Sequence, residues 1–282
     1  MNLAEVVADS AEKLSKYGIC EANLEAEVLI RMVMDIDKPT FFRDLRGDVS
    51  ASEQKQINGV IKRRQQREPL AYITGRKEFF GLDFVINEHV LVPRTETELI
   101  VETVINYSSK SQNPKLRIVD VGTGSGAIGV CLAHNLPLCD VLCVDLSPEA
   151  LLVAQTNAEI HDVTEKVDFL EGDLLTVISA KKDIIISNPP YIPSGRIGQL
   201  QEEVRQEPLM ALDGGPDGFG VIERLLKQSV EKLNTPGLIL IEIDTSQVNT
   251  GLLHASNNFP DSSVSILEDC FGKDRFLQIE LF

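Results

Sequence analysis

The first 75 residues repeat apolar positions at helical spacing. Apolar side chains recur every three or four positions in residues 3–14, 24–32 and 57–61. This spacing places them on one face of each helix, where they can pack against the other helices. The pattern predicts a small helical bundle in residues 1–75.

The pattern changes at Glu78, in the stretch EFFGLDFVINEHVLVPR. Two short runs of aromatic and β-branched residues stand there around polar turns, which is typical of short paired strands. We therefore predict a β-hairpin in residues 76–95 that links the bundle to the rest of the chain.

From Leu116 onward, continuous apolar runs alternate with glycine turns and helical patterns. Such alternation indicates a doubly wound, mostly parallel sheet. Ser147 before Pro148 predicts a helix start, because a serine hydroxyl caps the helix and proline suits its first position. The last two apolar segments, Ser263–Cys270 and Arg275–Phe282, are separated only by FGKD and predict an antiparallel hairpin at the sheet edge. The predicted fold class is α/β, with a Rossmann-like domain in residues 96–282.

Composition adds a strong acidic bias. The 282 residues carry a formal net charge of −16. Residues 1–75 hold 11 Lys+Arg and 12 Asp+Glu, which leaves 16 and 31 for the remainder, so the acidity lies in the C-terminal part. Nucleic-acid-binding proteins usually present a basic surface to phosphates. We therefore expect no direct nucleic-acid partner, and the charge asymmetry suggests two modules.

The cysteines and the N-terminus indicate an ordinary protein of the reduced cytoplasm. The five cysteines form no Cys-x-x-Cys pair and the four histidines are scattered, so we expect neither a metal site nor a disulfide framework. The N-terminus lacks the features of a signal peptide, and no stretch is long and apolar enough to span a membrane. We expect no membrane partner.

Acidic residues and glycines end the first three strands of the predicted sheet. Ligands of such sheets bind beyond the carboxyl ends of the strands, and a glycine turn lets the backbone approach them. The first strand ends near Asp120 and is followed by the turn Gly122, Thr123, Gly124, Ser125 and Gly126. Alone this turn is weak, because it also fits a dinucleotide-binding pattern or a plain tight turn.

The second and third strand ends add carboxylates. Asp145 ends the second strand, where its carboxylate can accept the two ribose hydroxyls of a nucleoside and repel a 2′-phosphate. Asp173 ends the third, where it can accept an adenine amine while Leu174 packs on the ring. Taken singly, each aspartate is better explained as a loop cap or a solvated charge. Together they predict a pocket for an adenosine-bearing cofactor without phosphate, which S-adenosylmethionine fits.

The fourth strand ends in DIIISNPPYIPSG, where two prolines stop the sheet ladder because they lack N–H donors. The Asn188 side-chain carbonyl and the Pro189 backbone carbonyl can each accept one N–H of a substrate NH₂ group, and Pro190 keeps the corner poor in donors. Tyr191 offers a flat face for a planar amide or base. We predict that catalysis consists mainly of positioning and nominate no general base. A proline strand stop with a capping asparagine is the alternative.

Asn-Pro-Pro-Tyr after a Gly-x-Gly-x-Gly motif resembles the class I amino-methyltransferases, which include DNA adenine and protein glutamine enzymes. REPLAYITGRKEFFGLDF, VLVPRTETELI, EEVRQEPLMALDGGPDG and FGKDRF are similar to the bacterial release factor glutamine N5-methyltransferases. This resemblance runs from about Arg67 to the C-terminus. Residues 1–70 fit that family's helical N-terminal domain in size.

The resemblance implies that the glycine turn, Asp145 and Asp173 bind S-adenosylmethionine. It also implies that Asn188–Tyr191 hold the glutamine of a Gly-Gly-Gln tripeptide in class 1 peptide chain release factors. Arg94 and Glu96 match a family motif near the active site, although residue chemistry alone predicts only a salt-bridged hinge there.

Three further expectations concern particular places in the chain. Residues 213–218 read as a loop over the site or as a plain surface loop. Leu174 stands where some relatives carry an aromatic residue, which predicts looser adenine stacking. Asp244 stands where the resemblance leads us to expect a glycine, so the conformation of that turn is open.

Three other functions compete with glutamine methylation. An adenine-N6 nucleic-acid methyltransferase uses the same strand end but needs basic surface for a flipped base. A non-catalytic S-adenosylmethionine-binding module would not need Asn188. An NAD-dependent dehydrogenase would need an acid or base for hydride transfer beside Asn188. We expect a monomer whose N-terminal bundle recognises the release factor beyond the tripeptide, because a tripeptide site alone cannot select one protein.

Overall fold

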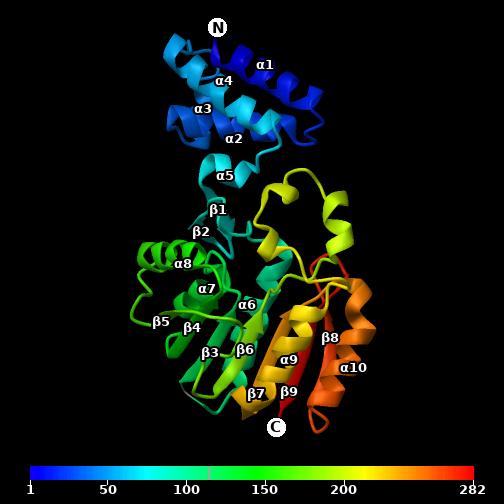
Figure 1. Ribbon diagram of the computed structural model, residues 1–282. Helices are drawn as coiled ribbons and strands as arrows, with labels where there is room; N and C mark the ends of the chain where they lie inside the picture. Colours follow the sequence, from blue (N-terminus) through cyan, green and yellow to red (C-terminus); the bar gives the residue numbers. More distant parts are fainter. Residues whose placement is uncertain (114) are drawn as a thin grey trace. The chain divides into compact units, whose positions relative to one another are not determined.

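The computed structural model describes residues 1–113 and 115–282. The chain forms two compact units (Figure 1). The first comprises residues 1–75 and 201–206, and the second comprises residues 76–200 and 207–282. Each unit has a hydrophobic core of its own. The sequence did not indicate that residues 201–206 belong to the first unit.

The first unit is the predicted helical bundle. Its helices are α1 (Leu3–Lys16), α2 (Ala22–Met34), α3 (Lys38–Arg43), α4 (Ala51–Gln65) and α5 (Leu70–Thr74). Capping boxes start α1 and α4, because Asn2 and Ser50 each exchange hydrogen bonds with a glutamate three residues later. The apolar faces predicted from the spacing meet in a core that includes Leu14, Leu29 and Ile57.

Ion pairs hold residues 201–206 within this unit. The Arg64 side chain is 6% exposed and lies 3.0 Å from Glu203, which also pairs with Arg67 at 2.8 Å. Arg64 pairs with Glu25 of α2 as well. A buried guanidinium is stable only when its charge is paired and its N–H groups are bonded. The segment is therefore bound to the bundle by charge more than by apolar contact.

The second unit begins with the predicted hairpin, which is shorter than the sequence suggested. Strands β1 (Arg76–Phe79) and β2 (Leu82–Val85) pair in antiparallel fashion. Residues 86–94 form no strand, although Val90 and Val92 are buried. The reason is visible at Val92, whose N–H donates to the Glu207 carboxylate instead of to a neighbouring strand.

A seven-stranded sheet forms the centre of the second unit. Its strands are β3 (Leu116–Val121), β4 (Cys139–Asp145), β5 (Val167–Glu171), β6 (Lys182–Ser187), β7 (Leu233–Glu242), β8 (Ser263–Glu268) and β9 (Asp274–Leu281). The strand order is β5-β4-β3-β6-β7-β9-β8. The first five are parallel, whereas β9 is antiparallel to both β7 and β8. The predicted doubly wound sheet with a C-terminal antiparallel hairpin is confirmed.

Helices cover the sheet. They are α6 (Glu98–Lys110), α7 (Ala127–Asn135), α8 (Pro148–Ile160), α9 (Gly220–Lys232) and α10 (Val248–Asn258). Short 3₁₀ helices lie at η1 (Thr95–Thr97), η2 (Ser194–Gln199), η3 (Val204–Gln206), η4 (Leu209–Ala211) and η5 (Thr245–Gln247). The predicted start of α8 is confirmed, because Ser147 Oγ accepts the Ala150 N–H at 3.1 Å.

The winding of the sheet reverses between β3 and β6. From β3 the chain moves through α7 to β4 and through α8 to β5, whereas β6 leads through α9 to β7 on the other side. Right-handed crossovers in opposite directions place their helices on opposite faces of the sheet. Figure 1 shows α9 in front of the strands. A reversal of this kind opens a crevice at the carboxyl ends of β3 and β6.

The conformation of the turn at Asp244, which the sequence left undetermined, is given by local structure. Asp244, where a glycine was expected, has φ −73° and caps η5 by accepting the Ser246 N–H, so this turn does not need a glycine.

Among residues 1–113 and 115–282, no helix is long and apolar enough to cross a membrane. The same residues include no group of three or more potential ligands that could hold a metal ion.

Candidate active site

The register of the sheet brings the predicted strand ends together. Val121 of β3 pairs with Val144 of β4 on one side and with Ser187 of β6 on the other. Ser187 Oγ also donates to the Val121 carbonyl at 2.7 Å. The residues that follow these positions are Gly122, Asp145 and Asn188. The glycine turn therefore lies between Asp145 and Asn188 at the sheet edge.

The turn after β3 depends on glycine conformations. Gly122, Gly124 and Gly126 have φ values of 71°, 55° and 79°, which side chains other than glycine rarely adopt. The N–H groups of Gly122 and Thr123 both donate to the Val144 carbonyl, at 2.8 and 3.0 Å. The turn is thereby tied to the end of β4 before α7 begins at Ala127.

Asp145 organises the end of β4. Its two carboxylate oxygens accept from Gly124 N at 2.8 Å and from Ser147 N at 2.9 Å. Burial raises the pKa of Asp145 above its ordinary value, while these two N–H donors oppose the rise. Each oxygen keeps further acceptor capacity, so the carboxylate can fix the glycine turn and still accept from a ligand hydroxyl.

Asp120 is a buried carboxylate beneath the glycine turn. In the sequence it was noted only as part of the end of the first strand. Its Oδ2 accepts from Thr123 Oγ1 at 2.6 Å and from Gly129 N at 3.1 Å. Burial raises its pKa to about 6, against the effect of those two donors. Asp120 joins the glycine turn to the first turn of α7 and lies below the cavity rather than in its wall.

Asp173 and Leu174 follow β5, and both line the cavity. Asp173 forms an ion pair with Arg224 of α9, a residue that the sequence did not single out. Both side chains of this pair are about half exposed, so the pairing is weak and compatible with exchange for a ligand. Leu174 has a φ of 54°, an unusual backbone conformation for a leucine.

The Asn-Pro-Pro-Tyr segment leaves β6 as predicted, and its members face different surroundings. Asn188 and Pro190 line the cavity, whereas Pro189 is buried and is not part of the lining. The Tyr191 ring packs against the core, outside the lining residues, and its hydroxyl donates to Glu242 Oε1 at 3.1 Å. Stacking of a substrate on Tyr191 stays a prediction.

Two buried residues that the sequence did not identify lie behind Asn188. Asn188 Nδ2 donates to Thr97 Oγ1 at 3.1 Å, and Thr97 Oγ1 donates to Glu242 Oε2 at 2.6 Å. Thr97 is 4% exposed and Glu242 is fully buried. Burial raises the pKa of Glu242 to about 7, with the hydrogen bonds from Thr97 and Tyr191 acting in the opposite direction.

The predicted pair Arg94 and Glu96 separates in the structure. Arg94 lines the cavity and pairs with Glu207 at 2.6 Å, and the Glu207 side chain is only 2% exposed. Glu207 also accepts the Val92 N–H at 3.0 Å. Glu96 lies in η1 and is not among the lining residues. The sequence-based hinge thus has Glu207 as its acidic partner, from 113 positions further along the chain.

The loop at residues 213–218 packs directly on the segment after Asn188. Asp213 lines the cavity, and Gly214 N donates to the Ile192 carbonyl at 2.9 Å. A Cβ on Gly218 would lie 2.3 Å from the Tyr191 carbonyl, so only glycine allows this approach. The loop therefore belongs to the wall of the site, which favours the first of the two sequence-based interpretations.

Asn157 of α8 connects the hairpin to the glycine turn and was not predicted. It is fully buried, its Oδ1 accepts Val85 N at 2.7 Å, and its Nδ2 donates to the carbonyls of Val85 and Ser125. A side-chain amide can form four hydrogen bonds, and the Asn157 side chain forms three. Asn157 therefore positions both β2 and the turn.

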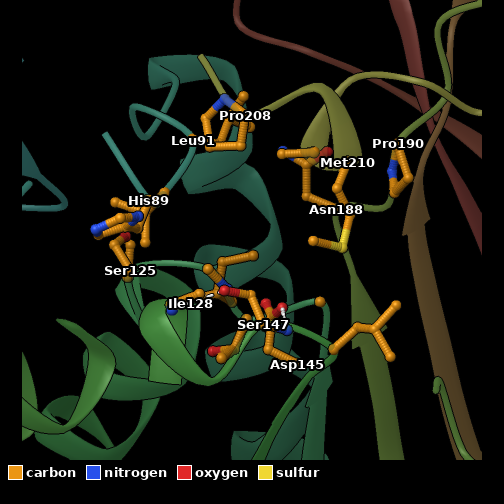
Figure 2. Close-up of a pocket in the computed structure, with 18 of the residues that line it drawn as sticks. His89, Leu91, Ser125, Ile128, Asp145, Ser147, Asn188, Pro190, Pro208 and Met210 are labelled. Carbon is orange, nitrogen blue, oxygen red and sulfur yellow. Dashed lines mark hydrogen bonds between the residues drawn. The ribbon is translucent and has the colours of Figure 1, made fainter. Parts of the chain in front are cut away.

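These residues surround one cavity of about 300 Å³ in the second unit (Figure 2). This size lies at the lower end of ligand pockets, which range from roughly 300 to 1,000 Å³. Figure 2 shows Asp145 and Ser147 at one part of the wall and Asn188 and Pro190 at another. Of the predicted site residues, the lining includes Arg94, Gly122, Thr123, Gly124, Ser125, Asp145, Asp173, Leu174, Asn188 and Pro190. Gly126, Pro189, Tyr191 and Glu96 lie outside it.

The donor set of this cavity fits an adenosine-bearing cofactor without phosphate. The half-buried Asp145 carboxylate can accept hydroxyl groups, and the glycine turn gives the backbone close access. Of the two arginines in the lining, Arg94 is held by the buried Glu207 carboxylate, whereas the half-exposed Arg224 pairs only weakly with Asp173. The Asp145 carboxylate would repel a phosphate placed beside the glycine turn.

Comparison with known proteins agrees with this geometry. The model of the PrmC N-terminal domain matches residues 5–75, and that of the Methyltransferase small domain matches residues 96–207. Among solved structures, a methyltransferase from Pyrococcus furiosus is similar in fold, with a TM-score of 0.51 and 18% identity over 72% of this chain and 89% of that chain. The fold and the strand-end cavity are those of an S-adenosylmethionine-dependent methyltransferase.

Curated relatives narrow the class to one family. A release factor glutamine methyltransferase from Moorella thermoacetica is 37% identical over 98% of this chain and 97% of its own length. One from Geobacter sulfurreducens is 38% identical over 85% of this chain and 83% of its own length. The chain belongs to the release factor glutamine methyltransferase family, and the resemblance seen in the sequence is confirmed.

Proposed function

We propose that this protein methylates the side-chain amide nitrogen, N5, of the glutamine in the Gly-Gly-Gln motif of class 1 peptide chain release factors. The observation that carries the proposal is the place of Asn188, which lines the cavity at the end of β6 and bonds Thr97 through Nδ2. Its carbonyl oxygen is then the atom that remains to accept an N–H from a substrate amide. Family membership supports the same substrate.

The cofactor is S-adenosylmethionine, which supplies the methyl group. We infer that Asp145 accepts its ribose hydroxyls and that Asp173 accepts the adenine amine, with Leu174 against the ring. Gly122, Thr123, Gly124, Ser125 and Gly126 form the turn that passes beside it. Support comes from the half-buried Asp145 carboxylate at the tip of β4 and from the cavity that these strand ends share.

The substrate amide would be held by acceptors on one side. Asn188 Oδ1 and the Pro189 carbonyl each accept one N–H of the glutamine NH₂ group, and Pro190 contributes no N–H that could compete. Tyr191 supports this segment, and Arg94 and Glu96 belong to the chain that borders it. An amide nitrogen is a weak nucleophile because its lone pair is delocalised, so alignment and N–H polarisation are the contributions left to the protein.

The reaction balances without a further reactant. A bond forms between N5 and the methyl carbon, the bond between that carbon and sulfur breaks, and the sulfur keeps the electron pair. N5 then loses one proton to water. The protein residues hold the amide nitrogen in line with the bond that breaks, and no residue is assigned as general base.

Recognition of the whole substrate protein would use the first unit, because three residues of substrate cannot identify one protein among many. The helical unit at residues 1–75 with 201–206 has its own core and can present a separate surface. We propose that the active form is a monomer, acts in the cytoplasm where release factors work, and binds no nucleic acid directly. The net charge of −16 supports the last point.

Mass spectrometry of an unmodified class 1 release factor, incubated with this protein and S-adenosylmethionine, tests the proposed function. We expect one added methyl group on the Gly-Gly-Gln glutamine. The Asn188→Ala variant should reduce kcat at least about 100-fold while still binding the cofactor. A wild-type protein that binds the cofactor yet leaves the glutamine unmodified would contradict the proposal.

An adenine methyltransferase is separated by a second measurement. We expect no duplex binding at low salt, where phosphate contacts are strongest, and release factor binding that changes little between low and physiological salt. Tight binding to duplex DNA or RNA with a steep salt dependence would favour the alternative.

A further inference from the structure

The Asn188 amide can serve as an acceptor only in one of its two orientations. An asparagine amide presents an oxygen on one side and an NH₂ group on the other, and the two differ by a flip of the terminal bond. With the oxygen toward the cavity it attracts the N–H of a substrate amide. With the NH₂ group toward the cavity it would repel the same N–H. The reaction proposed above therefore needs a means of selecting the orientation.

Thr97 can select it because a hydroxyl has a single proton. Thr97 Oγ1 lies 2.6 Å from Glu242 Oε2. Because an ionised carboxylate can only accept hydrogen bonds, the Thr97 hydroxyl donates its single hydrogen to Glu242. Toward Asn188, 3.1 Å away, Thr97 then has only lone pairs. Asn188 must therefore donate its NH₂ group to Thr97, and its carbonyl oxygen then points away from Thr97.

The polarity requires ionised Glu242, a form that burial opposes and that the hydrogen-bond donors around Glu242 favour. It is fully buried at the carboxyl end of β7, and its other oxygen accepts the Tyr191 hydroxyl at 3.1 Å. The other charged groups that act on it are Arg275 of β9, which favours its ionised form, and Glu96 of η1, which opposes it. Arg275 in turn pairs with Asp269. Both Glu242 oxygens thus accept hydrogen bonds from hydroxyl groups.

We propose that Thr97 and Glu242 are positioning residues that orient the Asn188 amide with its carbonyl oxygen toward the substrate glutamine. This inference rests on the proposed function. Neither residue touches the substrate in this scheme. The Glu242 carboxylate fixes the direction of the Thr97 hydroxyl group, and that hydroxyl fixes the orientation of the Asn188 amide, which holds the reacting nitrogen.

The scheme has a consequence for pH. A protonated Glu242 can donate to Thr97 Oγ1, and the Thr97 proton is then available to the Asn188 oxygen, which reverses the amide. Burial raises the pKa of Glu242 to about 7, so this reversal falls in an accessible pH range. Because the ionised form is the productive one, kcat should rise with pH through the Glu242 pKa and level off above it.

The test compares Thr97→Val, Thr97→Ser and Glu242→Gln with the wild type. Each is measured for kcat from pH 5.5 to 9 with an unmodified class 1 release factor and S-adenosylmethionine, both at saturation, and for cofactor Kd by calorimetry. Valine keeps the shape of threonine but has no hydroxyl group, whereas serine keeps the hydroxyl and is the matched control. Thermal unfolding identifies any variant that does not fold.

We expect Thr97→Val to lower kcat about 10- to 100-fold, the usual loss when a residue that orients a functional group is removed. Thr97→Ser should stay within about threefold of the wild type and keep its pH profile. Glu242→Gln should lose the low-pH limb, because no titrating group remains behind Thr97. Cofactor Kd should change less than about twofold in all three variants.

The outcomes separate this inference from the proposed function. A wild-type protein that binds S-adenosylmethionine but has no activity on the release factor overturns both. An active wild type together with a Thr97→Val variant of the same kcat and pH profile overturns the orienting role alone. If Thr97→Val does not fold, the Glu242→Gln pH profile decides, and an unchanged low-pH limb in that variant overturns the role of Glu242.

Discussion

Asn188 Nδ2 donates to Thr97 Oγ1 at 3.1 Å, although the two residues lie 91 positions apart in the sequence. Thr97 ends the short helix η1 before α6, and Asn188 follows β6. The contact links the segment after the hairpin to the strand end that would hold the substrate amide. It ties the most recognisable motif in this chain to a residue outside that motif.

Asp145 should matter for cofactor binding more than any exposed acid of the same sheet edge. Asp145→Ala removes the acceptor for Gly124 N and Ser147 N together with the proposed ribose contact. We expect the Kd for S-adenosylmethionine, measured by calorimetry, to rise about 10- to 100-fold, because two or more bonds to a charged acceptor are lost. Glu171→Ala is the control, since Glu171 pairs with Asp145 in the sheet register but is exposed and outside the cavity. Equal effects of the two variants would contradict the assignment.

Glu242 should make stability depend on pH. Its pKa is raised from 4.5 to about 7 in the folded state, so the folded protein binds the proton more tightly than the unfolded chain. The resulting stabilisation is complete below pH 4.5 and is lost as the pH rises through 7. A shift of this size corresponds to at most about 3 kcal/mol.

Urea unfolding of Glu242→Gln and wild type at pH 5 and pH 8.5 tests this prediction. The free energy of unfolding of the variant, relative to the wild type, should increase from the lower to the higher pH by up to about 3 kcal/mol. Asp120 is present in both proteins and cancels in the difference. A difference that is the same at both pH values would show that Glu242 titrates normally.

Asn157 should be worth more to stability than a typical asparagine on a helix. Asn157→Ala leaves the Val85 N–H and the Val85 and Ser125 carbonyls without their side-chain partner in a buried place. We expect a loss of about 2–4 kcal/mol in the free energy of unfolding, measured in urea. Asn106→Ala, on the exposed side of α6, should change it by less than about 0.5 kcal/mol. A loss below about 1 kcal/mol at position 157 would contradict this reading of the contacts.

The Arg94–Glu207 pair should show strong coupling in a double-mutant cycle. The Glu207 carboxylate is 2% exposed and accepts from Val92 N as well as from Arg94, so each single variant, Arg94→Gln or Glu207→Gln, leaves a poorly solvated partner. We expect a coupling free energy of about 1–3 kcal/mol from urea unfolding. The exposed pair Glu223–Lys227 is the control and should give about 0.5 kcal/mol or less. Similar values for both pairs would mean that burial adds nothing.

Local patterns in the sequence were sufficient for the elements and for the strand ends. Helical spacing predicted the bundle, apolar runs predicted the parallel strands, and Ser147-Pro148 predicted the start of α8. The turn from Gly122 to Gly126, Asp145 and Asn188 could be placed at one sheet edge, because parallel strands all end on the same side. These features depend on neighbours a few residues away, and the sequence shows such neighbours directly.

The partners of the site residues were decided only by the tertiary structure. Thr97 and Glu207 lie within motifs that resemble the family's, but those motifs do not show what either residue bonds. Glu242 and Asn157 had no such signal, since a polar residue in a strand or helix looks the same whether it faces water or another buried group. Each acquires its role when the fold excludes water and leaves a distant residue as its hydrogen-bond partner. The order of residues along the chain sets which groups stand at the strand ends. Tertiary packing sets the direction in which those groups point, because a donor shielded from water must bond to an acceptor beside it.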